Sequence, residues 1–244
     1  MDAKITGLLV FKNEAAFFLK ESVQSFLQLC DEVVCVDTGS VDNGVEILES
    51  LQDIRIKIVR RTQKKKCNKD YGDIRNWARQ FCTGDYVFNF DADEVLDDSW
   101  HLIKEQLLNR SEVECWSIQG KHYYWHLNKE DAQIPEHWWM HRLFKNTPLI
   151  QYPNNKAHGL PFGFKIHAKL KGVFIHHYGY CKNLAVDLWR YENNFGENNE
   201  IHTDEFLNNW LALRILGTFP TKPVDPIVHP RLIKDKFHME RLPR

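Results

Sequence analysis

The stretch Tyr86-Val87-Phe88-Asn89-Phe90-Asp91-Ala92-Asp93-Glu94 is the most informative part of this chain for its fold. Residues 86–90 are almost all apolar, which is typical of a short strand that is buried on both faces of a sheet. The apolar run stops at a group of acidic residues. Carboxylates at positions i and i+2 beyond a strand can project to the same side. The stretch therefore predicts a buried strand whose carboxyl end carries paired acidic side chains.

The chain upstream of this stretch alternates between strand-like and helix-like segments. Apolar runs typical of buried strands are followed by apolar residues at helical spacing. The expected strands are residues 5–11, 32–36, 54–59 and 86–90. The expected helices are residues 15–29, 42–51 and 70–82, the second of which Asp42 can cap. Because this alternation implies right-handed crossovers, it predicts an α/β fold with a mainly parallel central sheet flanked by helices.

The pattern changes after about residue 110. Short, aromatic-rich strands are expected at residues 114–118, 121–125, 142–144, 165–170 and 172–178. Helical spacing of apolar residues returns from Leu184, and the proline-rich tail from Phe219 is expected to be irregular. We therefore expect a nucleotide-binding type of domain over residues 1–182, and a C-terminal helical extension with an irregular tail over residues 183–244.

Polar residues follow three of the four expected strands of the first half. They are Asn13 and Glu14, Asp37, and Asp91 with Asp93. Ligands of parallel α/β sheets bind beyond the carboxyl ends of the strands, so this repeated placement predicts a binding site there. Oxygen ligands such as paired carboxylates suit Mg²⁺ or Mn²⁺. The alternatives are structural: a helix cap for the acidic pair, and an Asx turn for Asp37.

Composition excludes several classes of protein. The formal net charge is −1, whereas a nucleic-acid-binding domain usually carries a basic surplus. None of the six cysteines forms a Cys-x-x-Cys pair, which argues against a zinc knuckle or a thioredoxin-like site. We find no signal peptide and no apolar run near the ~20 residues that a membrane span needs. These features predict a cytoplasmic protein with free thiols.

Four motifs in order carry a resemblance to a known family. They are Phe11-Lys12-Asn13-Glu14, the Val-Asp-Thr-Gly-Ser-x-Asp segment at 36–42, Asp73-Ile74-Arg75-Asn76-Trp77-Ala78, and Phe90-Asp91-Ala92-Asp93-Glu94. Together they resemble glycosyltransferase family 2, with its GT-A nucleotide-sugar fold, in the branch of the lipopolysaccharide-core glucosyltransferases. The resemblance covers roughly residues 4–180.

The resemblance implies roles for residues at matching positions. It implies that the loop from Phe11 through Asn13 to Glu14 flanks the base and ribose of a nucleotide-sugar donor. Asp37 would bind the base or ribose, and Arg75 would lie near the diphosphate.

For the Asp91-Ala92-Asp93 motif, the resemblance implies that Asp91 contacts the ribose, or the metal through water. Asp93 would ligate Mn²⁺ or Mg²⁺ directly, and Ala92 between them would line the donor site.

His176 and His177 end an apolar run, and the resemblance implies that one of them reaches the metal or the diphosphate. Alternation along a strand sends only one of the two inward, and we favour His177. The alternative for either residue is a histidine with a purely structural role.

The motifs identify fewer residues for the binding of the acceptor than for the binding of the donor. An inverting transfer needs a carboxylate to take the proton of the acceptor hydroxyl. Glu136 in the aromatic segment before Arg-Leu-Phe is one candidate, and Glu94 is another. Relatives often carry a His-Glu pair where this chain has His158-Gly159, so one expected carboxylate is missing. Trp138 and Trp139 could stack on an acceptor sugar or belong to the core.

The sequence thus predicts a metal-dependent, inverting glycosyltransferase that moves a sugar from a nucleotide-diphosphate sugar, with UDP favoured, to a saccharide or glycoconjugate hydroxyl. Two alternatives stay open: a non-catalytic nucleotide- or sugar-binding module, and a nucleotidyltransferase. The latter usually has a Gly-rich basic loop where this chain has Phe-Lys-Asn-Glu. The oligomeric state and a peripheral contact with a membrane also stay open.

Overall fold

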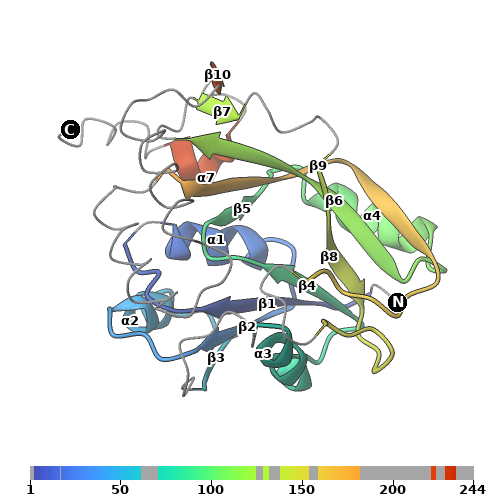
Figure 1. The fold of residues 1–244 in the computed structure, drawn as a ribbon, viewed down its shortest axis with the longest axis horizontal. Coiled ribbons are helices and arrows are strands. Elements are labelled where there is room, and N and C mark those ends of the chain that lie inside the picture. The colour runs from blue at the N-terminus through green and yellow to red at the C-terminus, as the bar shows by residue number, and fades with distance from the viewer. Residues whose placement is uncertain are drawn as a thin grey trace, which may run out of the picture.

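The structure is a computed structural model of the chain, and it shows a curled, mixed sheet flanked by helices (Figure 1). It describes residues 3–16, 18–61, 71–124, 129–131, 138–153, 159–181, 221–223 and 229–234. Within these residues no helix is long and apolar enough to cross a membrane. No disulfide joins the cysteines among these residues, which are Cys30, Cys35, Cys82, Cys115 and Cys181.

Four parallel strands form the first half of the sheet, in the lower part of Figure 1. They are β1 (Ile5–Phe11), β2 (Glu32–Asp37), β3 (Ile56–Arg60) and β4 (Tyr86–Phe90). Their order is β4-β1-β2-β3, so the chain crosses from one side of β1 to the other between β3 and β4. This half confirms the parallel α/β arrangement that the alternating pattern predicts.

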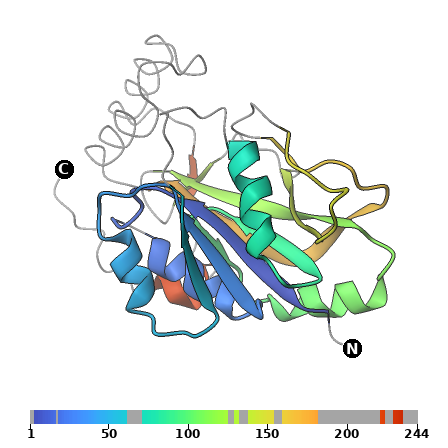
Figure 2. The same ribbon diagram turned by 90° about the horizontal axis from the view of Figure 1, so that it is seen from below.

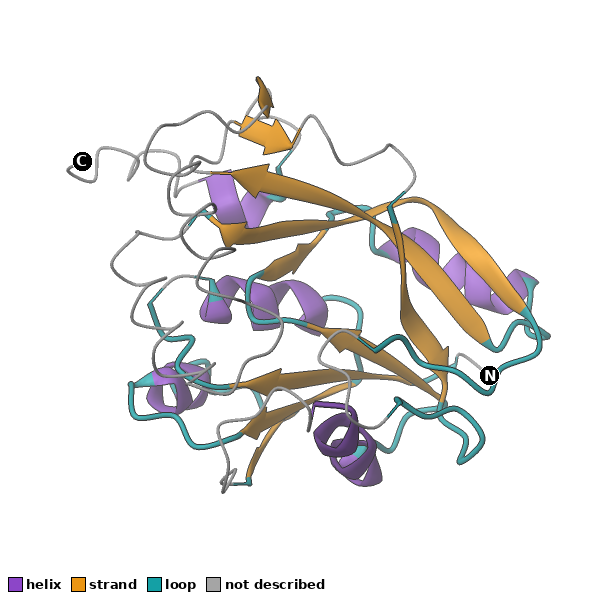
Figure 3. Ribbon diagram, viewed as in Figure 1, coloured by secondary structure: helices purple, strands orange, loops and turns teal. Residues whose placement is uncertain are grey.

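Helices cover both faces of these strands, as Figures 2 and 3 show. One core joins β1, β2 and β4 to the helices α1 (Leu19–Leu27), α2 (Gly44–Glu49) and α4 (His101–Asn109). A second core joins the other face to α3 (Tyr71–Ala78) and the short 3₁₀-helix η2 (Arg79–Phe81). Successive residues of β2 alternate between these two cores, which explains its uninterrupted apolar sequence.

The second half of the sheet mixes directions, and its long strands arch above the parallel strands in Figure 1. Its members are β5 (Glu94–Leu96), β6 (Cys115–Tyr124), β7 (Lys129–Asp131), β8 (Trp139–Lys145), β9 (His167–Tyr180) and β10 (Thr221–Pro223). Strand β8 pairs antiparallel with β4 and β6, whereas β6 and β9 are parallel. This mixed half extends the parallel sheet and brings β9 to β5 beside the acidic motif.

Three expectations about elements need correction. The strand expected at residues 54–59 begins at Ile56, because Ile54 is 99% exposed in a turn. The segments expected at 114–118 and 121–125 are one strand, β6, and those at 165–170 and 172–178 are one strand, β9. The tail expected to be irregular contains β10 and the helix α7 (Arg231–Lys234). The late helices expected from Leu184 lie outside the described residues.

Candidate functional site

The carboxyl ends of β1, β2 and β4 meet where the order of the parallel strands reverses. Phe11 at the end of β1 is level with Asp37 at the end of β2, and Leu9 is level with Phe90 at the end of β4. Crevices at such reversal points are where α/β sheets bind ligands. The structure therefore gathers the loop after β1, Asp37 and the Asp91–Asp93 motif at one edge of the sheet.

Asp91 is held by two arginines. Its Oδ2 lies 2.9 Å from Nη2 of Arg142, and its Oδ1 lies 3.4 Å from Nη2 of Arg75. Burial raises the pKa of the Asp91 carboxyl, but the charges of Arg142 and Arg75 outweigh burial and hold the pKa below its usual range. The Asp91 side chain is still 41% exposed. It is therefore an ionised, positioned carboxylate that a ligand can reach.

Glu94 is buried and forms an ion pair with Arg142. Its side chain is 1% exposed, and it also accepts a 3.0 Å hydrogen bond from the backbone N–H of Asp91. Burial raises the pKa of Glu94 from its ordinary value, and the charge of Arg142 opposes this rise and favours the ionised carboxylate. No acceptor hydroxyl reaches a carboxylate in this position. The structure thus assigns Glu94 to holding Arg142 and the motif backbone, which argues against its predicted role as the base.

Arg142 owes its orientation to a β-bulge. Trp116 of β6 is level with Leu143, but the next residue, Ser117, is level with His141, so Arg142 is the extra residue on β8. A bulge redirects the side chain that it carries and is common beside active sites. Here it turns the guanidinium of Arg142 toward the acidic motif on the neighbouring strands.

Asp93 faces His177 on the adjoining strand β9. Its Oδ1 lies 3.7 Å from Nε2 of His177, and its side chain is 14% exposed. Gly179 makes this approach possible, because a Cβ at that position would lie 2.7 Å from Nε2 of His177 and 3.0 Å from Oδ2 of Asp93. A carboxylate and an imidazole separated by this distance fit as two ligands of one divalent cation. Within the described residues, however, no three such side chains already form a closed metal cluster.

His176 points to the other side of β9. Its Nε2 lies 3.1 Å from Oδ2 of Asp97, and its Nδ1 lies 2.8 Å from the hydroxyl of Tyr123. Hydrogen bonds from His176 and Ser99 outweigh burial and lower the pKa of Asp97 to about 2, so Asp97 is an acceptor at neutral pH. Nε2 of His176 is therefore the donor. Both ring nitrogens are engaged, which removes His176 from the metal-ligand candidates and explains the preference for His177.

His122 of β6 completes a row of side chains across neighbouring strands. It is level with His177, and the centroids of the two rings are 4.6 Å apart. The ring of Trp138 packs against its other side at 3.9 Å. Burial and the neighbouring His177 lower the pKa of His122 to about 2, so this imidazole is neutral. Trp138 thus contacts His122, which in turn contacts His177, and it also packs against the core.

The loop after β1 is fastened to the loop after β2. Asn13 has a left-handed backbone (φ 57°), and its side-chain oxygen accepts a 2.8 Å hydrogen bond from the backbone N–H of Val41. Asp37 accepts hydrogen bonds from Gly39 and Ser40 through Oδ1 alone. The Asx turn foreseen as the alternative for Asp37 is therefore present, and it uses one of the two carboxylate oxygens.

The remaining predicted residues are placed less favourably for a direct role. The side chains of Phe11 and Ala92 are buried in the core, so only their backbone is available to a donor. Glu14 is half-buried in the loop after β1. The ring of Trp139, the first residue of β8, contacts the ammonium group of Lys169 at 4.6 Å, whereas the preceding Trp138 packs on His122. Glu136 and His158 lie outside the described residues.

Sequence reasoning missed the two residues that organise the site from the second half of the chain. Arg142 was visible only as part of an Arg-Leu-Phe motif, and nothing local marks a bulge. His122 stands in an aromatic run, Lys121-His122-Tyr123-Tyr124, and its proximity to His177 depends on the pairing of β6 with β9. Residues 122 and 177 are far apart in the sequence, and the alternation of apolar and polar residues within a strand does not indicate which distant strand it pairs with.

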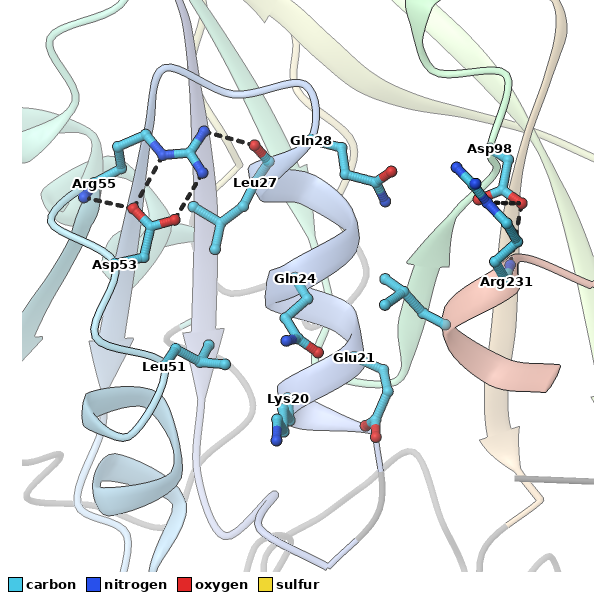
Figure 4. Close-up of a pocket in the computed structure, with 11 residues that line it drawn as sticks. Lys20, Glu21, Gln24, Leu27, Gln28, Leu51, Asp53, Arg55, Asp98 and Arg231 are labelled. Atoms are coloured by element: carbon cyan, nitrogen blue, oxygen red, sulfur yellow. Dashed lines mark hydrogen bonds and ion pairs between the residues drawn. The ribbon is translucent and has the colours of Figure 1, made fainter. Parts of the chain in front are cut away.

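A separate groove of about 770 Å³ runs along the outer face of α1 (Figure 4). The Asp53–Arg55 ion pair lies on one side of it, and Asp98 with Arg231 lies on the other. Its lining mixes both signs of charge and shares no residue with the Asp91–Asp93 motif. The groove is therefore not part of the site at the strand ends.

Comparisons with known proteins agree with this arrangement. A model of the family described as Glycosyl transferase family 2 matches residues 8–166. The lipopolysaccharide core biosynthesis glycosyltransferase LpsC of Rhizobium meliloti is 28% identical over 120 residues, which are 49% of this chain and 43% of LpsC. An uncharacterized glycosyltransferase of Rickettsia bellii is 36% identical over 93 residues, which are 38% of this chain and 29% of that protein. The matches span less than half the length of these curated relatives.

Solved structures show the same fold at low sequence identity. S. aureus TarS 1-349 in complex with UDP-GlcNAc has a TM-score of 0.55 at 15% identity, covering 97% of this chain and 71% of that one. The mannosyltransferase PcManGT from Pyrobaculum calidifontis, in complex with GDP-Man and Mn²⁺, has a TM-score of 0.51 at 15% identity, covering 98% and 69%. The chain thus has the GT-A fold, and it belongs to the family described as Glycosyl transferase family 2.

Proposed function

We propose that this chain is a metal-dependent, inverting transferase that moves a sugar from a UDP-sugar to a hydroxyl of a saccharide or glycoconjugate. The observation that carries the proposal is the pairing of Asp93 with His177 beside the arginine-held Asp91, at the strand ends where the fold binds ligands. A UDP-GlcNAc complex of the structurally similar TarS supports UDP as the carrier. The similarity to LpsC supports a glycoconjugate acceptor.

Asp93 and His177 are the residues that would hold the cation, Mn²⁺ or Mg²⁺. The carboxylate is partly exposed, the imidazole lies 3.7 Å from it, and the missing Cβ of Gly179 keeps space beside both. When bound, such a cation neutralises the developing negative charge of a departing diphosphate. The Mn²⁺ complex of the structurally similar PcManGT supports the same donor chemistry.

The other polar residues at the carboxyl ends of the parallel strands would bind the nucleotide. Oδ1 of Asp37 is used by its own turn, which directs Oδ2 as the acceptor for a base N–H or a ribose hydroxyl. Asp91, fixed by Arg142, would accept a ribose hydroxyl. Arg75, whose 3.4 Å contact with Asp91 is long, can exchange that contact for a phosphate oxygen and share the charge of the leaving group.

The acceptor would approach from the side of Trp138. In the transfer step the acceptor oxygen forms a bond to the anomeric carbon as the bond to the diphosphate oxygen breaks. The acceptor proton passes to a carboxylate, and the electron pair of the broken bond leaves with the diphosphate. Because Glu94 is buried and paired, we propose Glu136 as that carboxylate. Attack from the face opposite the leaving group inverts the anomeric centre.

A thermal-shift screen tests the donor and the metal together. UDP-, GDP- and dTDP-sugars are each added with and without Mn²⁺, since a ligand that binds only the folded state raises the melting temperature. We expect a shift with UDP-sugars that requires Mn²⁺. A shift with another nucleotide class would replace UDP in the proposal. No shift with any of them, together with no donor hydrolysis, would instead identify a binding module on an inherited transferase fold.

A further inference from the structure

His122 is a buried histidine whose ring nitrogens, Nδ1 and Nε2, have no hydrogen-bond partner among the residues that the structure describes. It is 7% exposed. Buried polar groups in folded proteins are nearly always paired, because leaving one unpaired is destabilising. The other histidines of this region, His176 and His229, are hydrogen bonded to Tyr123 and Tyr178. An imidazole left unpaired between them and the site points to a ligand that the polypeptide does not supply.

The position of His122 indicates what that ligand is. His122 on β6 is level with His177 on β9. Side chains that are level on neighbouring strands project from the same face of a sheet. The imidazole of His122 therefore adjoins His177, with ring centroids 4.6 Å apart, on the face where His177 meets Asp93 at 3.7 Å.

We propose that His122 is a further ligand of the divalent cation, so that the complete site consists of the carboxylate of Asp93 and the imidazoles of His177 and His122. This inference rests on the proposed metal-dependent function and adds a residue to that same site. No three such side chains converge at one point among the described residues. The ring of His122, which packs on Trp138 in this structure, must therefore turn toward Asp93 when the cation binds.

The chemistry of this ligand set selects the cation. Oxygen ligands suit both Mn²⁺ and Mg²⁺, but Mn²⁺ is a transition metal and tolerates imidazole nitrogen better than Mg²⁺, which demands a nearly ideal octahedron of oxygen atoms. A site with two imidazoles and one carboxylate should therefore favour Mn²⁺ over Mg²⁺. With His122 removed, the remaining carboxylate and single imidazole should discriminate less between the two cations.

The test measures binding of the metal alone to the full chain. Mn²⁺ binding is followed by the loss of the electron paramagnetic resonance signal of free Mn²⁺, and Mg²⁺ binding is followed by calorimetry. The variants are His122→Phe, which keeps a flat ring between Trp138 and His177, and His122→Ala. The matched control is His141→Ala on β8, whose ring packs with Phe164 and His167. Circular dichroism and metal-free melting temperatures establish that each variant is folded.

We expect both His122 variants to bind Mn²⁺ about ten- to a hundredfold more weakly, the loss typical when a metal site loses one supporting group. Mg²⁺ binding should change by about twofold or less, and His141→Ala should match the unmodified chain. Folded His122→Phe with unchanged Mn²⁺ affinity overturns the inference. So does an equal loss of UDP affinity with Mn²⁺ and with EDTA, which would make His122 a phosphate-binding residue. Asp93→Ala separates the two proposals: if it retains Mn²⁺ binding, the proposed metal site itself fails.

Discussion

The carboxylate of Asp91 lies 2.9 Å from the guanidinium of Arg142, and this contact makes the two acids of the Asp-x-Asp motif unlike. Asp91 already has a positive partner that lowers its pKa despite burial. Asp93 instead faces the imidazole of His177. A bound dication is therefore better served by Asp93, whereas Asp91 suits a neutral hydrogen-bond donor such as a ribose hydroxyl.

This difference between Asp91 and Asp93 predicts that replacing each of them impairs a different step. Asp93→Asn should lower metal-dependent donor turnover by about a hundredfold or more, because the leaving diphosphate loses its fixed counter-charge. Asp91→Asn should leave Mn²⁺ binding nearly intact and weaken binding of the UDP-sugar. Mn²⁺ titrations and steady-state kinetics on both variants measure this. Full donor turnover by Asp93→Asn with metal present would contradict the assignment.

The buried pair of Glu94 and Arg142 predicts a stability effect that is separate from catalysis. The side chains are 1% and 12% exposed, so Glu94→Gln or Arg142→Met leaves a charge without its partner inside the protein. Each single change should lower the free energy of unfolding by about 3–5 kcal/mol. Urea denaturation of each variant measures that loss.

The double variant Glu94→Gln/Arg142→Met supplies the control. Because it removes both charges together, it should be more stable than the sum of the two single losses implies. Strict additivity would mean that the two side chains do not interact energetically, and Glu94 would then not be the residue that holds Arg142 in place.

The first half of the fold could be predicted from the sequence because its strands are marked by patterns of neighbouring residues. Strands β1, β2 and β4 are short apolar runs buried on both faces, and each ends at a polar residue that breaks the run. Their carboxyl ends must meet at one edge once the crossovers are right-handed. Alternation also predicts that His176 and His177 point to opposite sides of their strand, and in the structure His176 contacts Asp97 whereas His177 faces Asp93.

The second half could not be predicted to the same depth, because its key contacts depend on strand pairing. The bulge that aims Arg142 arises from a one-residue mismatch between β6 and β8. His122 meets His177 only because β6 pairs in parallel with β9. The burial of Glu94 likewise follows from the pairing of β5 with β9, and no local pattern distinguishes a buried carboxylate from an exposed one.

The contacts of Asp97 with His176 and Ser99 predict that the stability of the fold depends on pH in the acid range. The pKa of Asp97 is lowered from 3.8 to about 2, so the unfolded chain binds the proton more readily than the folded one. The stabilisation is then present above pH 3.8 and is lost as the pH falls through about 2. It amounts to on the order of 2 kcal/mol. Asp97→Asn should remove it, as denaturation at pH 7, 4 and 3 can measure.

Asp98→Asn is the matched control, since it removes the neighbouring carboxylate, which contacts Arg231 near the surface. We expect this variant to keep the acid dependence of the unmodified chain. If Asp97→Asn keeps that dependence too, the Asp97–His176 contact is not its source.

The proposed base predicts a selective loss of transfer. Glu136→Gln should bind UDP-sugar with unchanged affinity but lower the transfer rate by about a hundredfold to ten-thousandfold, because the acceptor proton has no carboxylate to receive it. Glu130→Gln on β7 is the control for the loss of a different carboxylate. Thermal shift measures binding and product formation measures transfer. Unchanged transfer in Glu136→Gln would remove Glu136 from this role.

Gly179 predicts a loss that acts through His177. A Cβ at position 179 would lie 2.7 Å from Nε2 of His177, closer than real Cβ atoms approach, so Gly179→Ala must displace the imidazole or the Asp93 carboxylate. Gly179→Ala should therefore weaken Mn²⁺ binding about tenfold or more. The double variant Gly179→Ala/His177→Ala should bind Mn²⁺ no more weakly than His177→Ala alone, because the ring that the Cβ would meet is gone. A clearly additive loss would show that Gly179 serves the fold of β9 and not the placement of His177.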